Sequence, residues 1–177
     1  AVAAGDPRHG RRRRCSCCHR RRSSSLGVTL GVERLGLAAL LEDPDVLKIF
    51  HFARFDLAVL HERLGIDCRP VYCTKIASKL IRTYTDRHGL RDLLRETIGV
   101  EISKQQQSSD WGADQLTPEQ QSYAAGDVLH LHAVKRVLDE MLAREGRTDL
   151  ARACFDFLPA RARLDLLGWE EPDIFAH

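Results

Sequence analysis

The sequence lacks a long apolar segment. Its longest uncharged apolar run covers residues 35–41, far short of the roughly 18 residues that a membrane span needs. Hydrophobic residues make up 44% of the chain and charged residues 29%. This balance excludes a membrane protein, a collagen and a fully disordered chain, and the 177 residues suit one globular domain with a short tail.

Acidic residues are scarce at the start of the chain. Residues 1–30 contain eight arginines and one acid, Asp6, which gives a charge of +7. Because the whole chain has a formal net charge of +2, the other 147 residues carry 2 − 7 = −5. The sequence therefore divides into a basic head, residues 1–30, and a mildly acidic body, residues 31–177. The global charge gives no support to a large phosphate-binding surface.

The head also lacks hydrophobic periodicity of either kind. Its arginines and serines fit a transit peptide, but the apolar face of such a peptide is missing. Cys15, Cys18 and His19 would start a zinc site, although no second ligand pair follows. A basic arm on nucleic acid and an out-of-frame stretch of GC-rich coding sequence are the other interpretations. We expect the head to be disordered or badly packed, because it has too few apolar residues to offset the entropy cost of ordering.

A disulfide framework is missing as well. Three cysteines crowd into the head, and the other three, Cys68, Cys73 and Cys154, are scattered through the body without regular spacing. An odd number of scattered cysteines favours a reducing compartment, so we expect a cytoplasmic protein.

The body alternates between strand-type and helix-type segments. We expect strands at residues 46–50 and 71–73 and helices at 55–64, 74–81 and 89–98, two of them stopped by Gly65 and Gly99. Thr117, Pro118 and Gln120 form a strong helix start, and this helix should continue to about residue 144. Residues 104–110 read as a loop and 150–177 as a helical tail. The pattern predicts an α/β domain with a mixed central sheet flanked by helices.

Two places carry candidate chemistry. Asp56 falls in the first turn of a helix directly after a strand, where ligands bind in α/β sheets, although the helix dipole alone would favour an acid there. His51, just before it, is a candidate ligand or a hydrogen-bonded structural residue. Tyr123 and Asp127 are four residues apart in the helix that starts at Thr117, so both project from one face. A solvated face is the alternative for this pair.

The residues around these positions resemble a known family. Residues 48–57, KIFHFARFDL, are similar to the second motif of the ribonuclease D-type 3′–5′ exonucleases of the DEDDy group. Residues 121–128, QSYAAGDV, are similar to their third motif, Tyr-x-x-x-Asp. The resemblance runs from about residue 37 to the C-terminus. Residues 71–78, 103–111 and 173–177 are most similar to the nanoRNase C branch, which degrades dinucleotides and very short RNA.

This resemblance implies a ribonuclease H-like exonuclease fold and hydrolysis with two divalent metal ions, Mg²⁺ or Mn²⁺. It implies that Asp127 and Asp56 are metal ligands and that Tyr123 orients the attacking water. It implies short single-stranded RNA or dinucleotides as substrates, and a homo-oligomer as the assembly. The implied substrate-binding residues are His51, Phe52, Arg54, Lys104 and Gln107.

One motif of the family is missing. The family's first strand carries Asp-x-Glu after an apolar pair, whereas this chain has Ala3-Ala4-Gly5 after Ala1-Val2. Two of the four metal-binding carboxylates are therefore absent, which predicts a very poor nuclease. A catalytically dead relative that still binds nucleic acid is the second hypothesis. An interaction protein in which Asp56 and Asp127 are merely structural is the third.

Overall fold

The structure is a computed structural model that describes residues 29–102, 109–113, 115–171 and 173–176. These ranges form α-helices, one π-helical segment and two β-strands. In chain order they are α1 (Thr29–Glu42), β1 (Lys48–Phe50), α2 (Ala53–Val59), η2 (Leu60–Leu64), β2 (Val71–Cys73), α3 (Thr74–Ile81), α4 (Leu90–Ile98), α5 (Pro118–Leu129), α6 (Leu131–Arg144) and α7 (Thr148–Leu166). Residues 1–28, Lys104 and Gln107 lie outside the described residues, so what we expect of them stays a prediction.

The two strands pair in parallel. Lys48 lies opposite Val71, Ile49 opposite Tyr72 and Phe50 opposite Cys73. All three residues of β2 are buried, as expected for parallel strands covered on both faces. The α/β class is therefore confirmed. The sheet is smaller than the mixed sheet that we expected: within the described ranges it has these two strands and no antiparallel member.

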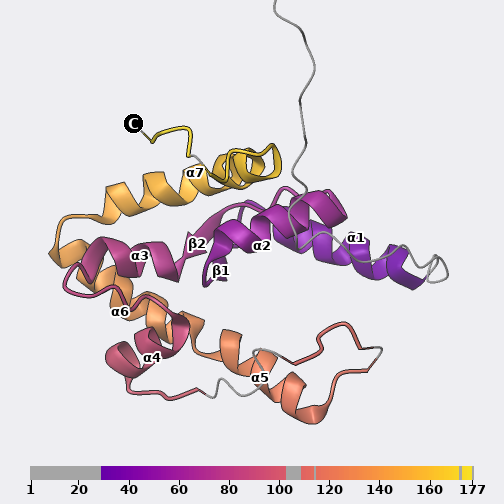
Figure 1. Cartoon of the computed structure of the whole chain (residues 1–177), viewed down its shortest axis with the longest axis horizontal. Helices are drawn as coiled ribbons and strands as arrows, with labels where there is room; N and C mark the ends of the chain where they lie inside the picture. Colours follow the sequence, from indigo (N-terminus) through magenta and orange to yellow (C-terminus); the bar gives the residue numbers. More distant parts are fainter. Residues whose placement is uncertain (1–28, 103–108, 114, 172, 177) are drawn as a thin grey trace, which may run out of the picture.

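The core surrounds these strands. Helix α2 packs against α7 and α3 packs against α6, with the strands in the middle of the molecule (Figure 1). The rings of Tyr72 on β2 and Phe155 on α7 lie 4.6 Å apart. Burial of apolar side chains is the main stabilising contribution to such a core. Its buried members include Ala53, Leu57, Ala77, Leu93, Leu94, Val134, Leu138, Leu142 and Ala162.

The helix ends follow the local sequence signals. Gly65 and Gly99 have φ values of 67° and 68°, which a glycine adopts without steric cost, and both end helical segments as predicted. At the start of α5, Oγ1 of Thr117 accepts a hydrogen bond from the backbone N–H of Gln120. Oε1 of Gln120 accepts one from the N–H of Thr117 in return. This capping box confirms the predicted helix start.

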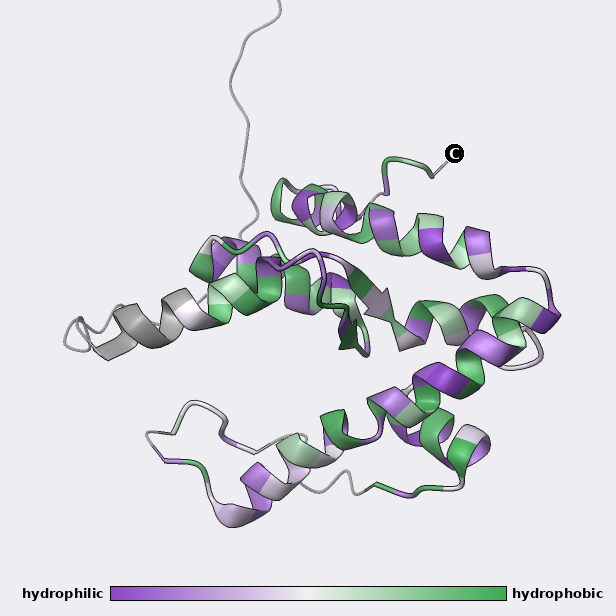
Figure 2. Ribbon diagram, turned by 180° about the vertical axis from the view of Figure 1, so that it is seen from behind, coloured by the Kyte–Doolittle hydropathy of each residue, from purple (hydrophilic) through white to green (hydrophobic). Residues whose placement is uncertain are grey.

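The prediction of one continuous helix from Thr117 to about residue 144 is wrong. Helix α5 ends at Leu129 and α6 begins at Leu131, because His130 leaves the helical path with φ −98° and ψ −4°. Leu131 is buried, whereas Leu129 is 69% exposed, and Figure 2 shows apolar residues at this end of α5.

The C-terminal helix ends earlier than predicted. Helix α7 spans Thr148–Leu166 and contains Pro159. It ends in a turn at Gly168, whose φ of 100° only glycine adopts readily, so the residues beyond are not helical. No helix in the described part of the chain is long and apolar enough to cross a membrane.

Candidate active site at the carboxyl end of the sheet

The chain makes a strained turn between β1 and α2. Phe52 lies directly before α2 with φ 72° and ψ 42°, the left-handed region, which is costly for a bulky residue. Its side chain makes no capping hydrogen bond to the helix. Outliers of this kind persist only where the surroundings hold them, and they concentrate at functional sites.

Asp56 lies in the first turn of α2, at the carboxyl end of β1. Burial raises the pKa of its carboxyl to about 6, and a hydrogen bond from its own backbone N–H opposes this rise. No cation in the described ranges forms an ion pair with it. Asp56 is therefore a partly buried carboxylate with little compensation, and such groups are candidates for functional sites.

Tyr123 and Asp127 lie together on α5. Burial raises the pKa of the Tyr123 hydroxyl, and the negative charge of Asp127 adds to this rise. Burial also raises the pKa of Asp127. The ring of Trp111 lies 5.9 Å from that of Tyr123. The predicted neighbourhood of the phenol and the carboxylate on one helical face is thus present.

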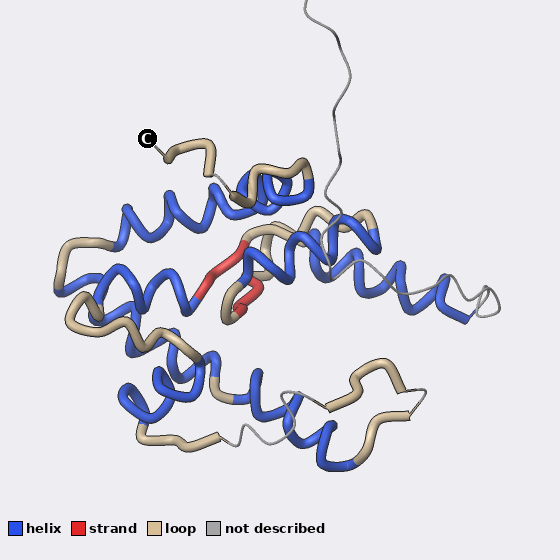
Figure 3. Tube along the Cα trace, viewed as in Figure 1, coloured by secondary structure: helices blue, strands red, loops and turns tan. Residues whose placement is uncertain are grey.

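The structure does not join this pair to Asp56. Helix α5 lies apart from β1 and α2 and connects to the rest of the fold through α6 (Figures 1 and 3). Neither aspartate carboxyl contributes to the pKa shift of the other. Among the described residues, no three His, Cys, Asp or Glu side chains gather where they could hold a metal ion. The role of Asp56 and Asp127 as metal ligands stays a prediction.

His51 is partly buried. Its Nδ1 lies 2.9 Å from Oγ1 of Thr74. Burial, together with the charge of Lys75, lowers the pKa of His51 to about 4. A neutral, hydrogen-bonded imidazole fits the structural alternative for His51 better than the predicted contact with substrate.

Phe52 and Arg54 have different surroundings. The Phe52 side chain is 45% exposed, and Nζ of Lys75 lies 4.1 Å from the centre of its ring. Phe52 is therefore accessible for the predicted substrate contact. Arg54 instead donates two hydrogen bonds to Asp165 of α7, at 2.5 and 2.7 Å. These two bonds connect α2 to α7, which favours a role for Arg54 in anchoring α7.

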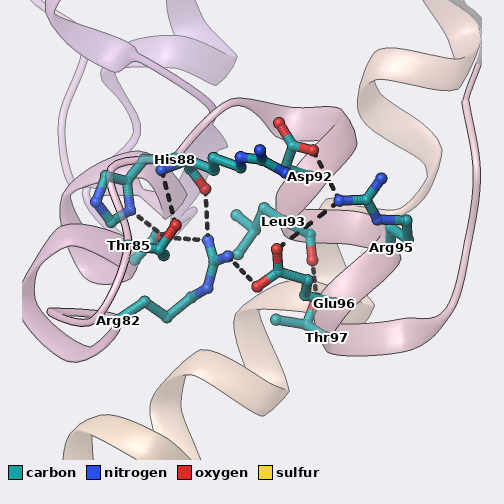
Figure 4. A network of polar contacts seen from close by, with 10 residues as sticks. Arg82, Thr85, His88, Asp92, Leu93, Arg95, Glu96 and Thr97 are labelled. Carbon is teal, nitrogen blue, oxygen red and sulfur yellow. Dashed lines mark hydrogen bonds and ion pairs between the residues drawn. The ribbon is translucent and has the colours of Figure 1, made fainter.

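A polar network around the buried Arg82 joins α3 to α4, and no sequence pattern predicted it. Arg82 is 1% exposed and pairs with Glu96 (Figure 4). Its Nη1 donates to Oγ of Ser78 at 3.0 Å and to the carbonyl of Arg87 at 2.9 Å. Oγ of Ser78 is also 2.9 Å from Nδ1 of His88. A basic residue just after a helix is common, so only the burial of Arg82 reveals its importance.

Comparison with known proteins gives the family. The sequence profile of a family described as 3′–5′ exonuclease matches residues 11–143, which is more than half of the chain and includes Asp56, Tyr123 and Asp127. The chain belongs to the 3′–5′ exonuclease family. Ribonuclease D of Gluconacetobacter diazotrophicus is 38% identical over 119 residues, which cover 67% of this chain. The chain spans about 30% of the length of that ribonuclease D.

Solved structures of this exonuclease family agree with the fold. NrnC of Brucella melitensis is 61% identical, with a TM-score of 0.77 over 80% of this chain and 68% of NrnC. RNase D of Escherichia coli is 28% identical, with a TM-score of 0.66 over 72% of this chain and 34% of its own. The chain thus belongs to the ribonuclease D-type exonuclease family and is more similar to NrnC than to the E. coli enzyme. Other structures show NrnC with bound Mg²⁺ and NrnC bound to pGG.

Proposed function

We propose that this protein is a metal-dependent 3′–5′ exonuclease that acts on dinucleotides or very short single-stranded RNA. The observation that carries the proposal is the family match across residues 11–143, which includes both the Asp56 turn and the Tyr123–Asp127 pair. The similarity to NrnC, of which a complex with the dinucleotide pGG is known, supports a short substrate. We assign Phe52 to substrate contact because it is 45% exposed and lies at the turn that leads into the helix of Asp56.

We further propose that Asp56 and Asp127 bind Mg²⁺ or Mn²⁺, and that they bind it weakly. Carboxylate oxygens suit both ions. The chain lacks Asp-x-Glu after Val2, and the described residues offer only two separated carboxylates at the site. Too little negative charge is then available to hold two dications, so we expect slow hydrolysis.

The test compares the chain with matched variants. A 5′-labelled dinucleotide is incubated with millimolar Mn²⁺ and the protein, beside Asp127→Ala and beside a version carrying Ala3→Asp and Gly5→Glu. We expect slow release of mononucleotide, its loss in Asp127→Ala, and a rate at least about a hundredfold higher in the restored version, since metal ions supply most of the catalysis in such sites. A rate that is independent of Asp127 and of Mn²⁺ would refute the proposal.

A catalytically dead relative that binds nucleic acid is the second candidate, favoured by the missing carboxylates. Binding and hydrolysis of the labelled dinucleotide together distinguish the two functions. A dead relative binds the labelled dinucleotide with the same affinity in wild type and Asp127→Ala and releases no mononucleotide at any Mn²⁺ concentration.

We also propose that the C-terminal segment supports self-association in the cytoplasm. Leu167, Trp169 and Phe175 are 71%, 47% and 61% exposed, and the rings of Phe157 and Phe175 lie 5.7 Å apart. Exposed apolar clusters of this kind mark interaction surfaces. Analytical ultracentrifugation at micromolar concentration should reveal an oligomer that Leu167→Asp disrupts, and a monomeric wild type would contradict the assignment.

A further inference from the structure

The end of β1 is tied to the start of α3 by three contacts. The parallel register places Phe50 opposite Cys73, so the residues that follow the two strands also lie next to each other. The hydroxyl of Thr74 donates to the carbonyl of Phe50 at 3.1 Å, and the same oxygen lies 2.9 Å from Nδ1 of His51. Lys75, the next residue, covers the ring of Phe52.

These contacts fall on the three residues that lead into α2. Phe52 is the only non-glycine residue with a positive φ in the described ranges, and it has no capping bond of its own. A bulky residue in this conformation relaxes unless neighbours hold it. The first two residues of α3 contact this turn: Thr74 bonds to Phe50 and His51, and Lys75 lies over the ring of Phe52.

A second polar network lies further along α3. The ring of His88 meets Ser78. Ser78 accepts a bond from Arg82, which pairs with Glu96 on α4 (Figure 4). Thr74 is fully buried at 0% exposure, so its hydroxyl bonds to the Phe50 carbonyl and the His51 ring and not to water. Buried hydrogen bonds of this kind rigidify the segments that they join.

We propose that Thr74 and Lys75 are positioning residues that hold the strained His51–Phe52 turn and thereby fix Asp56 at the carboxyl end of β1. This inference rests on the proposed function, because Asp56 is a site residue only if the protein is an exonuclease. Neither residue touches the reacting atoms in this assignment. Their role is exerted through the turn and the first helical turn of α2.

The test uses the full chain with paired variants. Thr74→Val removes the hydroxyl without changing the shape of the side chain, and Thr74→Ser keeps the hydroxyl. Lys75→Met removes the charge at a half-buried position that folding tolerates, and Lys79→Met, one turn further along α3 and exposed, is its control. Hydrogen exchange of the amides at residues 53–59 reports the turn, and Mn²⁺-dependent hydrolysis of a dinucleotide reports the site.

We expect Thr74→Val to speed exchange at residues 53–59 by about tenfold while α6 is unchanged. We expect kcat to fall about tenfold with little change in KM, because a misplaced group costs catalysis more than binding. Thr74→Ser should have wild-type exchange and wild-type kcat. Lys75→Met should change exchange and kcat in the same direction as Thr74→Val but less, and Lys79→Met should change neither.

Four outcomes overturn the inference. Unchanged exchange in Thr74→Val and Lys75→Met shows that the contacts do not hold the turn, whatever the activity. A loss that Thr74→Ser shares with Thr74→Val shows that the hydroxyl is not the cause. Hydrolysis that is normal in Thr74→Val, despite faster exchange, removes the positioning role but leaves the proposed function intact. If the variants change exchange as expected but the wild type never hydrolyses the dinucleotide, the proposed function is wrong and the positioning role is lost with it.

Discussion

Arg54 and Asp165 join the helix that carries Asp56 to the C-terminal helix. The guanidinium on α2 and the carboxylate on α7 make a two-pronged contact at 2.5 and 2.7 Å. Asp165 also lies 3.1 Å from Nη2 of Arg161, which in turn lies 3.3 Å from Asp173. The C-terminal segment is thus connected by charge to the segment that follows β1, over more than a hundred residues of sequence.

This ion pair should stabilise the fold. Arg54→Ala should lower the free energy of unfolding by about 2 kcal/mol, because it leaves the largely buried Asp165 without one of its two cations. A double-mutant cycle with Asp165→Ala should give a coupling energy of about 1–2 kcal/mol from denaturant melts. Arg152→Ala with Asp149→Ala, an exposed pair on α7, is the control and should couple weakly. Strictly additive effects at Arg54 and Asp165 would contradict the assignment.

Asp56 should make stability depend on pH. Its pKa is raised to about 6 from an ordinary 3.8, so between these values the folded protein binds more protons than the unfolded chain. The free energy of unfolding should therefore fall as the pH rises through this window and stay lower above it. Asp56→Asn should stabilise the protein by about 1–2 kcal/mol near neutral pH and have little effect below about pH 3.5.

The control for Asp56 is an exposed acid nearby. Glu62→Gln, in the adjoining segment η2, should leave the pH profile of unfolding unchanged. Saturating Mn²⁺ should remove part of the difference between wild type and Asp56→Asn if the carboxylate binds the ion, since a ligand that binds only the folded state stabilises it. An Asp56→Asn variant that is less stable than wild type near neutral pH would show that the carboxylate makes a favourable contact.

His51 should have the opposite dependence. Its pKa is lowered from 6.5 to about 4, so between these values the unfolded chain binds more protons than the folded protein. Stability should fall as the pH drops through this window, by about 2 kcal/mol in total. His51→Asn should flatten that part of the profile in urea melts, whereas His132→Asn, at an exposed position on α6, should not. A wild-type profile without this loss of stability at acid pH would mean that the folded protein protonates His51 at its ordinary pKa.

The backbone strain at Phe52 can be measured by comparing two truncations. Phe52→Ala removes the ring and its contact with Lys75 but keeps a Cβ in the left-handed region, so we expect a loss of about 1 kcal/mol. Phe52→Gly removes the same contact and also relieves the steric cost, so it should be more stable than Phe52→Ala by about 1 kcal/mol. If the glycine variant is the less stable of the two, the turn is not strained.

The start of α5 should depend on its cap. Thr117→Ala removes the oxygen that accepts from the N–H of Gln120, and it should cost about 1 kcal/mol. Hydrogen exchange should accelerate at the first turn of α5, before Tyr123, and Thr117→Ser should behave like wild type. Identical exchange in Thr117→Ala and wild type would show that packing alone fixes this end.

Local signals were sufficient for most of the secondary structure. Gly65, Gly99 and the Thr117 capping box act within a few residues, so the helix ends they set could be predicted from the sequence. The strand at residues 71–73 and the helix at 74–81 were predicted with the bounds that the structure has. The path at His130 could not be predicted, because neither a proline nor a glycine marks it and the break depends on how α5 and α6 meet the rest of the chain.

The family, the two candidate aspartates and the tyrosine are properties of the sequence, since motif spacing along a helix or after a strand is local. What surrounds them was decided by the tertiary structure. Arg54 has its partner 111 residues away, and the polar network from Glu96 through Arg82 and Ser78 to His88 joins segments that share no sequence pattern. The pKa of Asp56 is raised by burial, which depends on the side chains that the whole fold packs around it. The motifs thus identified the candidate site residues, and long-range packing determined which of their side chains are bound to other parts of the protein.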